Sequence, residues 1–132
     1  MILLDTNLLG RLTDANDPHG PIARRSMHVL LRRGEQLVIV PQNFYEFWAV
    51  ATRAPAVNGL GLTTDQASQW LGFFQRRFTL LPDREELPAR WHELVKSHSV
   101  KGFRSHDARL VAAMQSYGIT FDCAHRRRMR LP

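Results

Sequence analysis

Short runs that favour β-strands alternate along this chain with longer runs that favour α-helices. The strand-like runs are residues 2–5, 36–40, 78–81 and 119–121. Parallel strands need a crossover of a dozen or more residues, usually a helix, whereas antiparallel strands need only a tight turn. The alternation therefore predicts a parallel sheet covered by helices on both faces. A length of 132 residues leaves room for one such domain with a single core.

Local signals set the expected limits of the helices. Asp17 followed by Pro18 is typical of an N-cap and a first helical residue. Thr63, with Gln66 three residues later, matches a capping box, and Gly118 is typical of a helix end. We therefore expect one helix from residues 17–18 onward and four more over residues 43–53, 63–77, 86–98 and 105–117.

The cysteine content and the distribution of apolar residues exclude several classes of protein. A single cysteine, Cys123, permits neither an internal disulfide nor a cysteine metal cluster. No apolar stretch approaches the ~20 residues of a membrane span, and no basic region precedes the short apolar run at the N-terminus. We expect a cytoplasmic protein without membrane association or redox chemistry.

Arginine dominates the charge of this chain. Eighteen Lys and Arg residues against 12 Asp and Glu give a net charge of +6, and only Lys96 and Lys101 are lysines. Arginine pairs occur at 24–25, 32–33 and 76–77, and the chain ends HRRRMRLP. Any single pair can be a solvated helix face. The whole set favours a polyanionic partner, either nucleic acid or an acidic protein segment that mimics it, because the guanidinium fork suits phosphate oxygens.

Asp5 interrupts the first apolar run, within the sequence ILLDTN. An ionised carboxylate at the end of a buried strand costs several kcal/mol unless a partner neutralises it. Two interpretations stay open: Asp5 caps a helix that begins at Thr6, or it binds a cation. Ligands of parallel sheets bind beyond the carboxyl ends of the strands, and Asp122 directly follows the last expected strand. Both carboxylates should therefore lie at the same edge of the sheet.

Two further acids lie on expected helices. Asp107 shares a helical face with Leu110, Val111 and Met114, at offsets of three, four and seven residues. An acid that only interacts with the helix dipole could equally well lie on the solvent-facing side of the helix. The position of Asp107 on the inward face therefore favours a role in a binding pocket. Glu46 lies beside the apolar stripe of its helix rather than within it. Spacing alone predicts that Glu46 is a solvated residue.

Four motifs follow one another along the chain: ILLDTN, PQNFYEFWAVATR followed by NGLGLT, SHDARLVAAM and GITFD. Their order and approximate spacing resemble those of PIN-domain ribonucleases. The chain specifically resembles the VapC-type toxins of prokaryotic type II toxin–antitoxin systems, over essentially its whole length. The resemblance implies a single PIN domain over residues 1–132, an α/β fold built as a three-layer α/β/α sandwich around a mostly parallel sheet.

The resemblance also implies the residues of an active site. The acidic catalytic cluster would be Asp5, Glu46, Asp107 and Asp122. Three of these, Asp5, Asp107 and Asp122, would bind a metal, and Thr6 and Asn7 would orient a bound water or a ligating carboxylate. Glu46 enters this set through the resemblance alone, against the prediction from spacing.

The chemistry of such a cluster points to a cation. Carboxylates brought together repel one another, and their oxygens suit Mg²⁺ or Mn²⁺. The resemblance implies a Mg²⁺- or Mn²⁺-dependent endoribonuclease that leaves a 5′-phosphate and a 3′-hydroxyl. It further implies a homodimer and a VapB-like antitoxin as partner.

The C-terminal end departs from the family pattern. Relatives often continue the last motif with another acid and an aromatic residue, where this chain has His125 and Arg126. An alternative therefore stays open: a PIN-fold module that binds RNA but cleaves it weakly or not at all. We expect Arg127, Arg128 and Arg130 to contact RNA phosphates at the rim of the groove, unless the tail only aids solubility. Nothing in the sequence positively supports a purely structural, partner-binding domain.

Overall fold

The strands of the protein form one parallel sheet. The computed structural model describes residues 1–119 and, for residues 122–123, the backbone. Within this part of the chain the strand order is β3-β2-β1-β4. The strands are β1 (Ile2–Leu4), β2 (Leu37–Ile39), β3 (Thr79–Leu80) and β4 (Asp122–Cys123). All three pairings between them are parallel.

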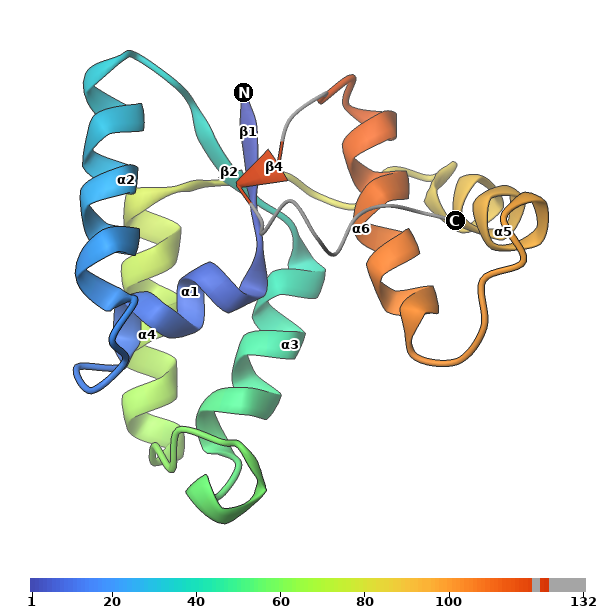
Figure 1. Ribbon diagram of the computed structural model, residues 1–132. Helices are drawn as coiled ribbons and strands as arrows, with labels where there is room; N and C mark the ends of the chain where they lie inside the picture. The colour runs from blue at the N-terminus through green and yellow to red at the C-terminus, as the bar shows by residue number, and fades with distance from the viewer. Residues whose placement is uncertain (120–121, 124–132) are drawn as a thin grey trace.

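Helices connect these strands and cover both faces of the sheet (Figure 1). They are α1 (Thr6–Thr13), α2 (Gly20–Arg32), α3 (Pro41–Thr52), α4 (Thr64–Arg77), α5 (Leu87–Ser97) and α6 (Arg104–Ser116). A short 3-10 helix, Pro55–Val57, precedes α4. No helix in the described part of the chain is long and apolar enough to span a membrane.

Alternate residues of β1 face two separate apolar clusters. Ile2 and Leu4 pack with residues of α1 to α4, including the fully buried Phe47 and Phe74. Leu3 packs with residues of α5 and α6 on the opposite face. Side chains alternate between the two faces of a strand, so a strand buried on both faces is apolar throughout. The expected three-layer α/β/α sandwich with a parallel sheet is confirmed.

The predicted elements are largely present. Strands β1, β2 and β3 lie inside the expected runs, and α3 to α6 begin and end within about two residues of their expected limits. The capping box of α4 is formed in both directions. The Gln66 N–H donates to Thr63 Oγ1 at 3.1 Å, and the Thr63 N–H donates to Gln66 Oε1 at 2.9 Å.

The predicted start of the second helix is wrong. Helix α2 begins at Gly20, and Pro21 occupies its first turn. Asp17 instead begins a turn, in which its Oδ1 accepts a hydrogen bond from the His19 N–H at 2.8 Å. The segment contains two prolines three residues apart, Pro18 and Pro21, and it is Pro21 that lies in the first turn of the helix. A helix that the sequence offered only as an alternative, α1, follows β1 directly from Thr6.

The last strand also differs from its prediction. Ile119 is not in a strand, because its N–H donates to Met114 O at the end of α6. Strand β4 consists of Asp122 and Cys123, and Asp122 is paired with Leu3. Asp122 is therefore part of the strand rather than the residue beyond it. The rest of that expected strand, residues 120–121, and the tail with its arginines lie outside the described residues.

One buried amide joins the elements that carry the first two acids. Asn43, in the first turn of α3, has no exposed surface (0%). Its Nδ2 donates to Leu4 O at 3.0 Å and to Thr6 Oγ1 at 3.3 Å. Its Oδ1 accepts from the Val40 N–H at 2.8 Å. A single side chain thus fixes the ends of β1 and β2 and the starts of α1 and α3.

Replacement of this amide should destabilise the fold strongly. Asn43→Ala leaves buried polar groups without partners, and each such group costs about 1–3 kcal/mol. We expect the free energy of unfolding, measured by urea denaturation, to fall by about 3 kcal/mol. Asn16→Ala, at an exposed asparagine, is the matched control and should change it by less than about 0.5 kcal/mol. Equal losses in the two variants would contradict the role given to Asn43.

Candidate active site

Asp5 lies directly after β1 and caps α1. Its Oδ1 accepts a hydrogen bond from the Asn7 N–H at 3.4 Å, and its side chain is half-buried. Thr6 is buried, with its hydroxyl bound by Asn43, whereas the side chain of Asn7 is exposed. The capping interpretation of Asp5 is therefore realised. Capping uses one carboxylate oxygen, so it does not prevent Asp5 from binding a cation.

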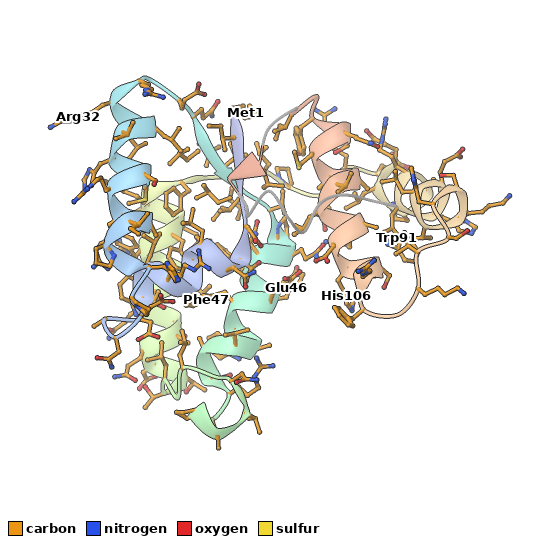
Figure 2. All side chains as sticks on the ribbon, in the orientation of Figure 1. Met1, Arg32, Glu46, Phe47, Trp91 and His106 are labelled. Carbon is orange, nitrogen blue, oxygen red and sulfur yellow. The ribbon has the colours of Figure 1, made fainter. Side chains whose placement is uncertain are left out.

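Glu46 and Asp107 line the same cleft, between α3 and α6. The cleft has a volume of about 680 Å³, and both acids are half-buried in its wall. Figure 2 shows Glu46 on α3 and His106 at the start of α6 on opposite sides of this space. Glu46 is therefore not the solvated residue that spacing alone predicted. Asp107 lies on the same helical face as the buried Leu110 and Met114, where the sequence placed it.

Asp122 lies on the strand next to β1. Its backbone is paired with Leu3, two residues before Asp5. Its side chain is outside the described part of the structure. The fold thus places the backbone of Asp122 near the end of β1, on the edge strand β4.

The donor atoms at this edge of the sheet bear on the expected metal centre. Among the described side chains, no three of His, Cys, Asp or Glu form a group that could hold a metal ion. The donors that are present are carboxylate oxygens, the ligand type that Mg²⁺ and Mn²⁺ prefer. These carboxylate oxygens are therefore chemically suited to a hard divalent cation. Asp122 is one more acid on the neighbouring strand.

A buried glutamine connects α3 to α6 beside the cleft. Gln42 is 5% exposed. Its Nε2 donates to Glu46 Oε1, one turn further along α3, and to His106 O at 2.8 Å. Its Oε1 accepts from Arg109 Nη1 at 2.8 Å, while Arg109 Nη2 lies 2.7 Å from Asp83 Oδ2.

Sequence reasoning missed this connection. The spacing of Gln42 and Glu46, four residues apart on a helix, is a signal that they can interact. Arg109 comes from a distant part of the chain, and only the packing of α6 places it beside Gln42.

Two exposed aromatic residues also line the cleft. Tyr45 is 67% exposed and Phe103 is 81% exposed, although large aromatic side chains are usually mostly buried. Each lies close in sequence to an acid of the cleft, Tyr45 beside Glu46 and Phe103 one turn before Asp107. Aromatic rings that face solvent at a cleft are suited to stack on a ligand with a flat face.

The paired arginines lie elsewhere. Their exposed side chains come from α2 with its C-cap and from α4, on the opposite face of the sheet from α5 and α6 (Figure 1). Of the described arginines, Arg109 lines the cleft. The basic surface expected from the sequence is therefore divided between the layers, with its paired residues on the layer away from α6.

The parallel sheet and its two helical layers form a PIN-like fold of the kind found in VapC-type toxins. No model of a known protein family matches the sequence, and a comparison with curated proteins finds no significant match. Among solved structures, the chain is similar to Mycobacterium tuberculosis VapC20, a toxin that cleaves the sarcin–ricin loop. The match has a TM-score of 0.70 at 19% sequence identity, and covers 95% of this chain and 89% of VapC20.

Two substitutions of Asp5 separate its capping role from its charge. Asp5→Asn should leave the free energy of unfolding of the metal-free protein nearly unchanged, because asparagine caps helices as well as aspartate. Asp5→Ala should lower it by about 1 kcal/mol through loss of the cap. Chemical denaturation in EDTA measures both, with Asp65→Asn as an exposed control. A loss of about 1 kcal/mol in Asp5→Asn would mean that the charge itself stabilises the fold.

Proposed function

We propose that this protein is a metal-dependent endoribonuclease and the toxin of a VapBC-type toxin–antitoxin pair. The observation that carries the proposal is that Glu46 and Asp107 line one cleft of a VapC-type fold, although they come from different helices. Carboxylates are seldom left half-buried in a cleft for stability alone, because burial removes part of their hydration. Their placement is better explained by a function that needs concentrated negative charge.

The reaction proposed is hydrolysis of a phosphodiester bond in RNA. The oxygen of a water molecule attacks phosphorus, the bond to the 3′ oxygen breaks, and that oxygen leaves with a proton as a 3′-hydroxyl, while the phosphate stays on the 5′ end. Glu46 is suited to accept a hydrogen bond from the attacking water. Asp5, Asp107 and Asp122 would hold Mg²⁺ or Mn²⁺, which supplies a Lewis acid to polarise the phosphate.

The rim of the cleft supports RNA with unpaired bases as the substrate. Proteins recognise single-stranded loops by stacking splayed bases on aromatic side chains. Tyr45 and Phe103 offer two exposed rings beside Glu46 and Asp107. The structurally similar toxin VapC20 cleaves the sarcin–ricin loop, and a loop is a substrate of this kind.

Replacement of either cleft acid should abolish cleavage without unfolding the protein. We expect Glu46→Gln and Asp107→Asn to lower the rate of RNA cleavage at least about 100-fold, because each removes a charge needed at the reacting phosphate. The assay uses purified protein on total RNA with Mg²⁺, Mn²⁺ or EDTA, and tests the products for 5′-phosphate ends. EDTA should stop cleavage by the parental protein.

Two exposed acids provide matched controls. Glu93→Gln and Asp65→Asn lie on α5 and α4 and line neither wall of the cleft, so they should keep the parental rate. Cleavage that survives in the cleft variants would show a contaminating nuclease or a different site. Tight RNA binding by the parental protein without cleavage would favour the alternative, an inactive RNA-binding module.

A second cavity supports the proposal that this protein binds a protein partner. It has a volume of about 530 Å³ and is bordered by α1, α2 and α4, with Leu12, Met27, Trp70, Phe73 and Arg24 in its lining. A groove with apolar walls suits the apolar face of an amphipathic helix. We assign this partner to a VapB-like antitoxin and propose that the toxin itself is a homodimer.

Expression experiments test the partner. Production of the chain alone in a bacterial host should slow growth, and co-production of a small protein encoded beside its gene should restore growth and co-purify with it. Arg24→Glu should weaken that complex at least tenfold, whereas Arg33→Glu, at the exposed end of α2, should not. Harmless expression without any partner would contradict the toxin assignment, and light scattering of the purified chain tests the dimer.

A further inference from the structure

A neutral amide separates the guanidinium of Arg109 from the carboxylate of Glu46. Gln42 binds both groups at once, accepting from Arg109 Nη1 at 2.8 Å and donating to Glu46 Oε1. Gln42 is 5% exposed, and its bonds to these two groups are partly buried. Buried polar side chains are usually fully hydrogen-bonded, and Gln42 satisfies this with three partners, the third being His106 O at 2.8 Å.

The three partners determine how the amide is oriented. Glu46 and the carbonyl of His106 are acceptors and must face the NH₂ group, whereas Arg109 is a donor and must face the oxygen. The reverse orientation would place acceptors against the amide oxygen and donors against its NH₂ group. The contacts therefore fix one orientation of Gln42, and Gln42 in turn fixes one oxygen of Glu46.

The charge of Arg109 is directed away from the cleft acid. Its second nitrogen forms an ion pair with Asp83 Oδ2 at 2.7 Å. A direct pair between Arg109 and Glu46 would hold the carboxylate equally well but would largely cancel its charge. An amide holds the same oxygen with a neutral donor, so the carboxylate keeps its negative charge.

We propose that Gln42 is a positioning residue for Glu46. It fixes the orientation of the carboxylate across the cleft and keeps Arg109 from pairing with it. Asp83, through its ion pair with Arg109, completes the chain of contacts. This role rests on the proposed nuclease function, because a fixed and charged Glu46 matters for a reaction in the cleft and not for the packing of the fold.

Gln42→Glu separates positioning from structural support. A glutamate at this position has the same shape and still accepts from Arg109, so the connection between α3 and α6 remains. It cannot donate to Glu46 or to His106 O. The new carboxylate repels that of Glu46, so we expect the melting temperature to fall, and the kinetics are measured well below it. We expect kcat for RNA cleavage to fall at least tenfold and KM to change less than threefold. A residue with only a structural role would leave kcat at the parental value.

Trp91→Phe is the control for the start of α6. The Trp91 indole Nε1 donates to Ser105 O at 2.8 Å, next to the carbonyl that Gln42 binds. Its removal loosens the same turn without affecting Glu46. We expect kcat to stay within twofold of the parental value. An equal fall of kcat in Trp91→Phe and Gln42→Glu would overturn the proposal, as would unchanged kcat in Gln42→Glu.

A spectroscopic measurement tests the contact itself, independently of catalysis. In a ¹H–¹⁵N NMR spectrum, the side-chain amide protons of Gln42 should exchange slowly with solvent. Glu46→Ala should shift them and speed their exchange, whereas Glu93→Ala should not. Unchanged Gln42 signals in Glu46→Ala would overturn the proposal even if RNA is cleaved. If the signals shift as expected but the parental protein leaves RNA intact, the proposed function fails and the contact between Gln42 and Glu46 stands.

Discussion

The hydrogen bonds of the Asn43 side chain are the constraint on which the candidate site depends. They join the last residue of β1, the first residue of α1 and the backbone just after β2. Asp5 lies between the first two of these points, and Glu46 follows Asn43 by one turn of α3. An amide buried among polar backbone groups tolerates little displacement, because each lost bond leaves an unsatisfied group. The backbone positions of both acids are therefore fixed by the ends of these elements.

The electrostatics of the cleft follow from where the cations are placed. The paired arginines lie on the layer formed by α2 and α4, and Arg109 is occupied by Asp83 and Gln42. Within the described residues, Glu46 accepts a hydrogen bond from a neutral donor. A strongly basic protein thus contains a cleft in which Glu46 is held by an amide rather than by a guanidinium. In the proposed reaction, the arginines of one layer attract the RNA chain, and its reacting phosphate meets carboxylates beside the other layer.

The sequence predicted the architecture well, because the alternation of strand-like and helix-like runs follows directly from burial on a parallel sheet. The start of α2 was missed because Pro18 and Pro21 compete for the same helical position, and packing decides between them. Glu46 could not be placed from helical spacing, since its burial comes from α6. The bond between Gln42 and Arg109 joins residues that only the fold brings together. The four motifs, in contrast, indicated the fold correctly from their order alone.

The position of β1 in the sheet has a consequence for how the protein is made. Of the four strands, β1 is synthesised first and β4 last, yet the two are neighbours in the sheet, where β1 lies between β2 and β4. Contacts between distant parts of a chain form late, after the local helices. The apolar cluster under α1 to α4 can assemble as soon as these helices have been synthesised, whereas Asp107 and β4 join the fold later. The acidic edge of the sheet is therefore the part of this fold that forms last.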